Sequence, residues 1–292
     1  LPMGNISILS REEIGRDYTE ARTLKRKLNN GDWVYVSEEN QLLVLSDEVA
    51  RQINSSELIE EEVLNELVEN KIMIKKADQR DDYKPLFVEP KNILFKSSSF
   101  LIDVNGIVAF TISIFLFVIK GSPFGSAVNV LFTNPLKFLL IAILVSIVST
   151  TFHEFMHIIF SRNSRKINLN IVKAVATIPM THVWTWSRFG RITAITSGMS
   201  SDAIFLLVFL IMNNKSVGVN SIAASILITR ILWQFIIIQK TDINILISFV
   251  VDNPFYFEEV AIMKLIIIKV ISISVLAMII WLWFQPVINQ FN

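Results

Sequence analysis

The chain contains no cysteine, few histidines and, over most of its length, few acidic residues. Without cysteine it can form no disulfide, no thiolate metal site and no cysteine nucleophile, so a bound metal ion would need histidine and carboxylate ligands. Only three of the 292 residues are histidine, and only seven of the 26 acidic residues follow residue 98. The formal net charge is +1 and no basic stripe is interleaved with aromatic residues, which argues against nucleic acid as a partner.

Apolar residues are abundant and unevenly distributed. They make up 52% of the chain, and the mean hydropathy is +0.51, which is unlike an average soluble protein. We expect a small soluble N-terminal domain of the α+β, winged-helix-like type in residues 1–98, followed by an α-helical multi-spanning membrane domain in residues 99–292. A helix needs roughly 20 apolar residues to cross a bilayer, and about five segments approach this length: 100–119, 136–160, 192–212, 219–238 and 261–284. Residues 243–251 are apolar but too short to cross, which predicts an interfacial or re-entrant piece.

Basic residues gather between the second and third of these segments. Residues 161–191 contain six lysines and arginines and no acidic residue, so the positive-inside rule predicts that this connection is cytoplasmic. The N-terminal domain is then expected on the same side. The chain opens at Leu1 without a basic-then-apolar stretch, so no signal peptide is expected.

The most informative motif is His153-Glu154-Phe155-Met156-His157, which continues directly from the apolar run of residues 138–149. In a helix His153 and His157 lie one turn apart on one face, where both rings reach a single metal ion and Glu154 is a candidate base. Ionisable residues in a spanning segment are costly to bury and by default mark a functional site. The alternative is a pair of histidines that hydrogen-bond between helices, with Glu154 paired to a basic side chain.

A catalytic zinc ion usually has three protein ligands and one open position, so the motif requires a third ligand. Asp242 is the preferred candidate, because the fourth apolar segment runs back to the cytoplasmic face just before it. Asp202, a few residues into the third segment, and His182, in the basic connection, are alternatives. Asp252 is a more remote one.

The N-terminal domain is expected to open with an amphipathic helix over residues 11–28, since Ser10-Arg11-Glu12-Glu13 is a capping box. Residues 33–36 and 42–45 resemble two strands around a polar turn, which predicts a hairpin. Ser46 then caps a short helix, and a second helix follows Ser55-Ser56, with apolar residues on one side.

This order, together with the wording of residues 32–76, resembles the PqqD-like leader-recognition domains, which serve enzymes that modify ribosomally made peptides. The resemblance implies that the leader of a precursor peptide binds by adding a strand at the edge of the sheet. The long helix expected before the first strand is not part of the family's usual pattern. The alternative is a generic winged-helix-like module that stabilises the membrane domain or binds a partner protein.

Residues 136–255 resemble the site-2 protease family of intramembrane zinc metalloproteases. The residues from His153 to His157 match the family's metal and base motif, and Thr241-Asp242 matches the position of its later aspartate ligand. The segment from Ser197 to Asp202 is similar to the family's Gly-Pro segment, which opens the next core helix.

Three departures from the family pattern leave Asp202 with several possible roles. The chain has Ile243 where a glycine usually follows the aspartate, Met199 in place of the proline and Asp202 in place of an asparagine. Asp202 is therefore a group behind the ligands, a substitute ligand or a helix-start residue exposed to water. Alternating residues at 172–175 and 181–186 predict strands near the membrane surface. In the resembling family such strands bind substrate in extended form, although Trp184 and Trp186 could equally form an interfacial belt.

Together the two resemblances imply a membrane zinc metalloprotease that cleaves a ribosomally made, modified peptide. They imply one Zn²⁺ per chain held by His153, His157 and Asp242, with Glu154 activating water. Expected partners are the precursor peptide, membrane lipid, a peptide-modifying enzyme and an ABC exporter, and the expected location is a bacterial cell membrane, with the N-terminal domain in the cytoplasm. One alternative is a non-catalytic scaffold or exporter accessory that delivers a peptide. The other is a regulatory intramembrane protease that acts on a membrane-anchored regulator.

Overall fold

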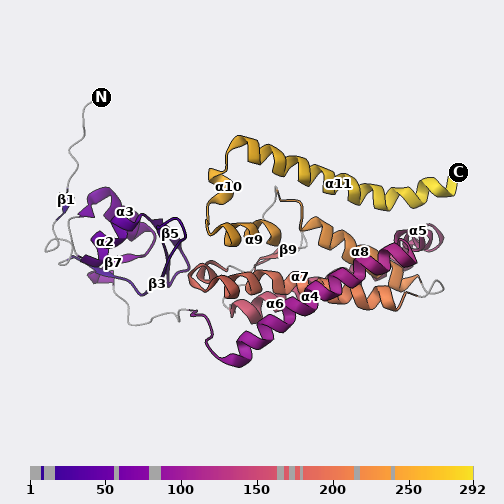
Figure 1. Ribbon diagram of the computed structural model, residues 1–292, viewed down its shortest axis with the longest axis horizontal. Helices are drawn as coiled ribbons and strands as arrows, with labels where there is room; N and C mark the ends of the chain where they lie inside the picture. The colour runs from indigo at the N-terminus through magenta and orange to yellow at the C-terminus, as the bar shows by residue number, and fades with distance from the viewer. Residues whose placement is uncertain are drawn as a thin grey trace. The chain divides into compact units, whose positions relative to one another are not determined.

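A computed structural model describes residues 8–9, 17–55, 59–78, 87–162, 168–170, 175–177, 180–213, 218–237 and 241–291. The chain forms two compact units: unit 1 contains Leu1–Glu89 and Pro179–Arg191, and unit 2 contains Pro90–Ile178 and Ile192–Asn292. Figure 1 shows the elements of each unit by label. The domain boundary expected at residue 98 lies inside helix α4 (Ile93–Lys120), and the segment 179–191 returns to unit 1 from far along the chain.

Unit 1 is built on short antiparallel strands. Strand β4 (Trp33–Ser37) lies between β3 (Thr23–Lys27) and β5 (Leu42–Leu45). The β4–β5 pairing, with Asn40 in its turn at φ 66°, confirms the predicted hairpin. Two smaller pairs join β1 (Ile8–Leu9) to β6 (Ile59–Glu60) and β2 (Tyr18–Glu20) to β7 (Met73–Lys75).

The helix predicted over residues 11–28 is wrong in its second half, whereas residues 11–16 lie outside the described residues. Residues 18–20 and 23–27 form β2 and β3 instead. Leu24 pairs with Val36, and Arg26 pairs with Val34 of the buried strand β4. Residues 23–27 therefore form a strand despite the helical spacing of their apolar residues, because pairing with the most buried strand overrides local propensity.

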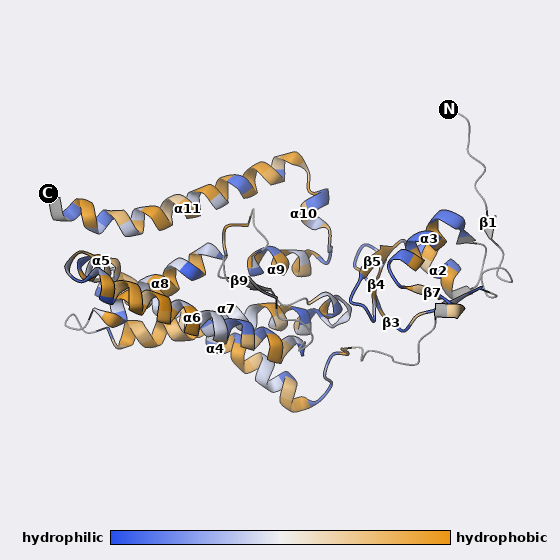
Figure 2. Ribbon diagram, turned by 180° about the vertical axis from the view of Figure 1, so that it is seen from behind, coloured by the Kyte–Doolittle hydropathy of each residue, from blue (hydrophilic) through white to orange (hydrophobic). Residues whose placement is uncertain are grey.

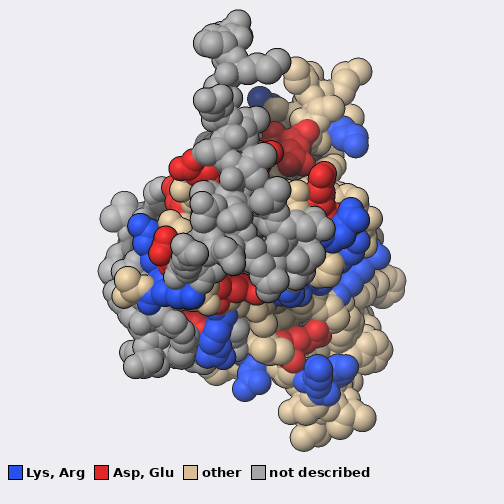
Figure 3. Space-filling model, turned by 90° about the vertical axis from the view of Figure 1, so that its left-hand side faces the viewer, with Lys and Arg blue, Asp and Glu red and all other residues tan. Residues whose placement is uncertain are grey.

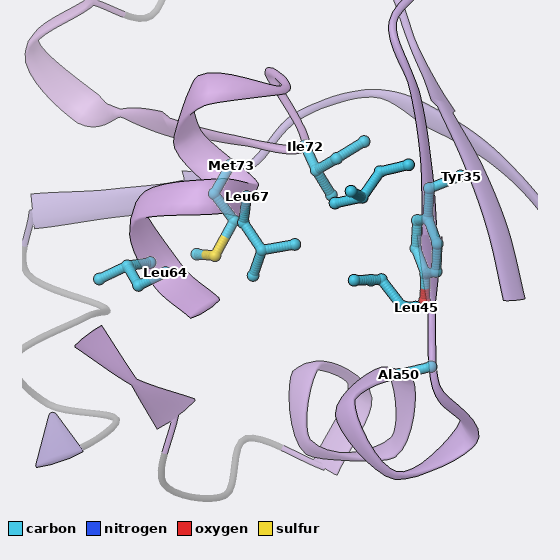
Figure 4. Close-up of a cluster of buried hydrophobic side chains, with 8 residues drawn as sticks. Tyr35, Leu45, Ala50, Leu64, Leu67, Ile72 and Met73 are labelled. Atoms are coloured by element: carbon cyan, nitrogen blue, oxygen red, sulfur yellow. The ribbon is translucent and has the colours of Figure 1, made fainter. Parts of the chain in front are cut away.

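Helices close the apolar interior of unit 1. Helix α2 (Asp47–Ser55) is capped by Ser46, whose hydroxyl oxygen accepts the Val49 N–H at 3.3 Å, as predicted. Helix α3 (Glu61–Glu69) begins later than expected and buries Leu64 and Leu67, and the 3₁₀ helix η1 (Lys76–Asp78) follows β7. Figure 4 shows the resulting core, which comes from the hairpin, from α2 and α3, and from Ile72 and the start of β7: Tyr35, Leu43, Leu45, Ala50, Leu64, Leu67, Ile72 and Met73. Acidic and basic side chains lie interspersed on the surface shown in Figure 3.

Unit 2 is helical. It contains a small antiparallel pair, β8 (Asn168–Asn170) with β9 (Val175–Thr177). Helix α7 begins in the last residues of unit 1 and continues through unit 2. The helices of unit 2 are α4, α5 (Phe124–Thr133), α6 (Pro135–Ser161), α7 (Arg188–Ile211), α8 (Val219–Trp233), α9 (Asp242–Val251), α10 (Tyr256–Glu259) and α11 (Ile262–Phe291).

Within the described residues, four helices are long and apolar enough to cross a membrane: Ile93–Lys120, Pro135–Ser161, Arg188–Ile211 and Ile262–Asn289. Hydrophobic residues predominate along α4 and α11 in Figure 2. The expected count of about five needs correction, because α8 has only 15 residues. Its length of about 22 Å falls short of the roughly 30 Å hydrocarbon core.

Helix α8 ends early because polar groups stabilise a fold-back of the chain. The Thr241 hydroxyl donates to the Gln234 carbonyl at 2.8 Å, and the Asp242 N–H donates to Oε1 of Gln234 at 3.1 Å. The Asn244 side chain donates to the Ile237 carbonyl at 3.0 Å. These bonds replace helical ones and bring the start of α9 back toward the interior of unit 2. The apolar piece expected at 243–251 forms the short helix α9 (Asp242–Val251), and its being too short to cross is confirmed.

Small and polar residues bring α4 against α7. A Cβ atom added at Gly106 of α4 would clash with the Ser200 side chain of α7, so only glycine permits this approach. The two oxygens of Asp103 accept hydrogen bonds from Thr193 at 2.6 Å and Thr196 at 2.7 Å. Small residues and interhelical hydrogen bonds are the usual means of helix association in an apolar solvent.

Candidate metal centre

Helix α6 directs two imidazoles into the interior of unit 2. Asn134 caps its start, where the side chain accepts the Lys137 N–H at 3.1 Å, and the helix runs unbroken past the histidines. His153 and His157 are 2% and 3% exposed, and their ring centroids lie 4.8 Å apart. The spacing of four residues therefore places both rings on one buried face, as the sequence predicts.

Asp242 completes a three-residue cluster with these rings. Its Oδ2 atom lies 2.8 Å from His153 Nε2 and 3.5 Å from His157 Nε2, and the two Nε2 atoms lie 3.1 Å apart. Tetrahedral zinc with bonds of 2.0–2.1 Å would place its ligand atoms about 3.3 Å apart. The three separations bracket that value, so the cluster has the size of a metal site. Asp242 is thus the candidate third ligand that the structure brings to the motif.

The outer nitrogen of each ring faces an acceptor. His157 Nδ1 lies 2.8 Å from the Ala194 carbonyl oxygen, and His153 Nδ1 lies 2.8 Å from Oδ2 of Asp202. A carbonyl or carboxylate oxygen accepts here, so each Nδ1 donates, and a ring that carries no second proton turns the lone pair of Nε2 toward the cluster. The alternative, in which the two histidines hydrogen-bond between helices, therefore holds for their Nδ1 atoms, which bond to α7.

A positive charge would stabilise the cluster. Two lone pairs and a carboxylate oxygen at these distances repel unless a positive charge lies among them. Either a proton shared by His153 and Asp242 or a metal ion bound by all three residues supplies that charge. Burial favours the neutral form of the Asp242 carboxyl, but where the charge is a proton on His157 or His153 it lowers the pKa of Asp242 below its usual range.

Gly198 of α7 keeps the space beside the cluster free. A Cβ atom added there would lie 2.6 Å from His157 Nε2 and 2.7 Å from His153 Nε2. Those are the two atoms that would bind the metal, so a side chain at this position would occupy the space in front of them. Glycine at this position therefore lets α7 pass close to both rings.

Glu154 lies between the histidines on α6 and is half-buried. Its carboxyl is close enough to His153, His157 and Asp242 to interact with their charges. It is not one of the three clustered ligands within the described residues. Glu154 thus lies beside the three candidate ligands and is not one of them, which fits the candidate base that the sequence predicts.

Asp202 lies behind His153. It is 0% exposed and sits in the middle of α7, so the helix-start interpretation with exposure to water is wrong. Its Oδ2 accepts from His153 Nδ1 and, at 2.8 Å, from Nε of Arg230. Asp202 therefore contacts the imidazole nitrogen that faces away from the cluster and acts as an outer partner there.

The other predicted candidates lie elsewhere. His182 belongs to unit 1, where its ring packs against Phe87 and Trp186 at centroid distances of 5.2 and 5.7 Å. The strand predicted at 181–186 is wrong, because residues Thr181–Thr185 form the 3₁₀ helix η2, with Trp184 and Trp186 buried. Asp252 ends α9 with a left-handed φ of 65°.

Sequence reasoning missed Arg230 and Gln234. A signal for Arg230 was present, since it is the only arginine after residue 191 and it interrupts the apolar run at 219–238. Gln234 gave no comparable signal, because its role depends on how α9 approaches α8. Gly198 lies in the segment that resembles the family's Gly-Pro segment, but the sequence did not predict its approach to the histidines. Comparison of the chain with protein-family models, with curated proteins and with solved structures gives no match. The functional conclusion therefore rests on the residues and their geometry.

Proposed function

We propose that the protein is a membrane-embedded zinc endopeptidase that cleaves a ribosomally made, modified peptide precursor. The observation that carries this proposal is the convergence of His153 Nε2, His157 Nε2 and Asp242 Oδ2 in the buried interior of a highly apolar helical unit. Histidine and carboxylate donors suit zinc, and three protein ligands with a further open position are typical of catalytic rather than structural zinc.

Each residue of the site has a defined part in this proposal. His153, His157 and Asp242 hold the metal, and Asp202 and the Ala194 carbonyl keep the Nδ1 protons in place, so that both Nε2 lone pairs stay available. When bound, zinc supplies Lewis acidity, which makes water a stronger acid and polarises a peptide carbonyl. Glu154 accepts the proton of the attacking water at its carboxylate and passes it to the leaving amine.

Two features of the chain support a peptide as the substrate. Strand β9 packs against α6, so a strand-forming segment contacts the helix that carries both histidines. In unit 1 the hairpin β4–β5 leads into α2 and α3, the order that resembles leader-recognition domains. Within the described residues, β3 and β5 each pair on one side only, so a leader could add a strand to this sheet.

Glu154→Gln tests the proposal, because the amide keeps the shape of the side chain and cannot accept the proton. The wild-type protein and the variant are purified in detergent and incubated with a candidate precursor, taken from a short peptide gene next to this one. Cleavage is followed by mass spectrometry and zinc content by atomic emission. The expected result is equal zinc content and a loss of cleavage of about 10²–10⁴-fold.

The same experiment separates the alternatives. Equal cleavage by both proteins would contradict the role of Glu154. Tight binding of the precursor without cleavage by the wild type would favour the scaffold or exporter accessory. Cleavage of a membrane-anchored regulator, with the small precursor left intact, would favour the regulatory protease.

A further inference from the structure

A layer of polar residues lies behind His153 and links three helices. Asp202 of α7 accepts from His153 Nδ1 and from Arg230 Nε, each at 2.8 Å and both at the same oxygen, Oδ2. Arg230 of α8 also donates through Nη1 to the hydroxyl of Thr150, which lies about one turn before His153 on α6. The contacts therefore run from α6 through α8 and α7 and back to the imidazole on α6.

We propose that Asp202 and Arg230 form a positioning pair for the metal centre. Asp202 holds the His153 ring in one orientation and one tautomer, with Nε2 free to bind the metal, and Arg230 holds the Asp202 carboxylate in place. This inference rests on the proposed function, because it takes His153 to be a metal ligand.

The way in which Asp202 uses its oxygens supports this role. The side chain is fully buried, and its Oδ1 atom has no hydrogen-bond partner within the described part of the chain. Leaving a buried carboxylate oxygen unsatisfied is costly. Both donors nevertheless bind Oδ2, the oxygen that contacts His153. This is the arrangement expected where the position of the imidazole matters more than the satisfaction of the carboxylate.

Asp103 provides a comparison in the same unit. Asp103 also accepts two hydrogen bonds, both from threonines of α7. Its Oδ2 accepts from Thr193 and its Oδ1 accepts from Thr196, so both oxygens are satisfied. That arrangement suits a contact whose purpose is to join helices. The two carboxylates thus differ in how they use their oxygens: Asp103 uses both, whereas Asp202 uses one. Asp103 is therefore a matched control.

Arg230 supplies the permanent positive charge that faces Asp202. Among the described contacts of Asp202, the other ionisable partner is His153. The Arg230 guanidinium reaches Asp202 and Thr150 through two different nitrogens, which fixes the plane of the group between α6 and α7. An arginine can bridge two acceptors in this way, whereas a lysine ammonium acts as a single point charge. Glutamine at this position would remove the charge and leave Asp202 without its anchor.

The test measures zinc affinity of the full chain in detergent micelles, by competition with a chromophoric zinc chelator. The visible absorption of the Co²⁺-loaded protein reports the coordination geometry independently of activity. Asp202→Ala should weaken zinc binding by about 10–100-fold, the usual effect of losing the outer partner of a metal-binding histidine. Asp202→Asn, which keeps an oxygen acceptor, should lose less, and Asp103→Ala should bind zinc like the wild type.

A double-mutant cycle tests whether Arg230 acts through Asp202. Arg230→Gln should weaken zinc binding in the wild-type background and add little to Asp202→Ala, while Arg230→Lys should recover part of the loss. Wild-type affinity in Asp202→Ala would overturn the inference and leave the proposed metal site intact. Additive losses would overturn the pairing. A wild type that binds no zinc would overturn the proposed function and this inference with it. If thermal unfolding shows that Asp202→Ala does not fold, Asp202→Asn and Arg230→Gln provide the same comparison.

Discussion

The two units of this protein place polar and apolar residues in opposite ways. Unit 1 buries Val34, Tyr35 and Leu67 and exposes charged residues such as Lys25 and Glu62. Unit 2 exposes large apolar side chains along α4, α6 and α11, and it buries histidine, aspartate and many serines. Unit 1 therefore has the pattern of a domain that folds in water, and unit 2 has the pattern expected in an apolar solvent.

This contrast indicates where function lies in each unit. In unit 1 a buried side chain is usually apolar, so burial there reports stability. In unit 2 apolar side chains cover the outer surface. A buried ionisable group there is costly and therefore marks a functional site. Four buried or half-buried ionisable residues of unit 2 form one hydrogen-bonded group, since each bonds to another of the four: His153, His157, Asp202 and Asp242. Mutations should therefore affect metal binding in unit 2 and folding in unit 1.

The largest expected effect concerns the space in front of the rings. Gly198→Ala should abolish measurable zinc binding, because the added methyl group would lie within 2.7 Å of both Nε2 atoms. Gly125→Ala is the matched control, since a Cβ atom there meets nothing within 4 Å. Zinc content of the two purified variants provides the measurement. Full zinc content in Gly198→Ala would show that the metal does not occupy this space.

The apolar core of unit 1 should respond next. Leu67 is fully buried, so Leu67→Ala should lower the local stability of unit 1 by about 2–5 kcal/mol. Leu140→Ala on α6 removes a side chain that is 60% exposed, and it should change stability by less than about 0.5 kcal/mol. Hydrogen exchange of residues 33–45 and of α6 in the full chain measures both effects. A larger loss from Leu140→Ala would contradict the contrast between the units.

A smaller effect is expected at the contact between α4 and α7. Thr196→Val removes the hydroxyl that donates to Asp103 at 2.7 Å and keeps the shape of the side chain. Interhelical hydrogen bonds of this kind contribute about 0.6–2 kcal/mol. The melting temperature in detergent should therefore fall slightly, while zinc affinity stays unchanged. A marked loss of zinc would mean that Asp103 contributes to the metal site.

The smallest effect is expected at the surface of unit 1. Hydrogen bonds from Lys27 at 2.8 Å and from the Trp33 indole at 3.0 Å lower the pKa of Asp47 below its ordinary value. Because the folded pKa is the lower one, this stabilisation is present above the unfolded pKa of about 3.9 and is lost as the pH falls through the folded pKa. Asp47→Asn should therefore slightly reduce exchange protection in β4 at neutral pH. The difference from the wild type should vanish in acid, and a difference that grows in acid would contradict this assignment.

The sequence predicted the elements whose signals are local. The hairpin at residues 33–45 follows from its strand-like runs and turn, and the His153–His157 face follows from a spacing of four within one helix. The second half of the predicted helix at 11–28 failed because Leu24 and Arg26 also suit a strand, and only the presence of β4 decides between the two. Periodicity does not contain that information.

The remaining parts of the site depend on contacts between helices. Asp242 could be placed near the histidines only through an assumed fourth span, yet α8 stops at Trp233 and Gln234 holds the fold-back. The structure thus brings Asp242 to the histidines, but by a different path of the chain from the one that was assumed. The partner of Asp202 could not be read from spacing, since Arg230 is 28 positions away on another helix.

Zinc content of the purified wild-type chain, compared with His157→Ala and Asp242→Ala, tests the central claim most directly. His182→Phe serves as the control, because His182 lies in unit 1 and an aromatic ring can replace it against Phe87 and Trp186. We predict about one zinc ion per chain in the wild type and in His182→Phe, and none in the other two variants. A well-folded wild type without zinc, or zinc retained by both His157→Ala and Asp242→Ala, would contradict the metal centre described above.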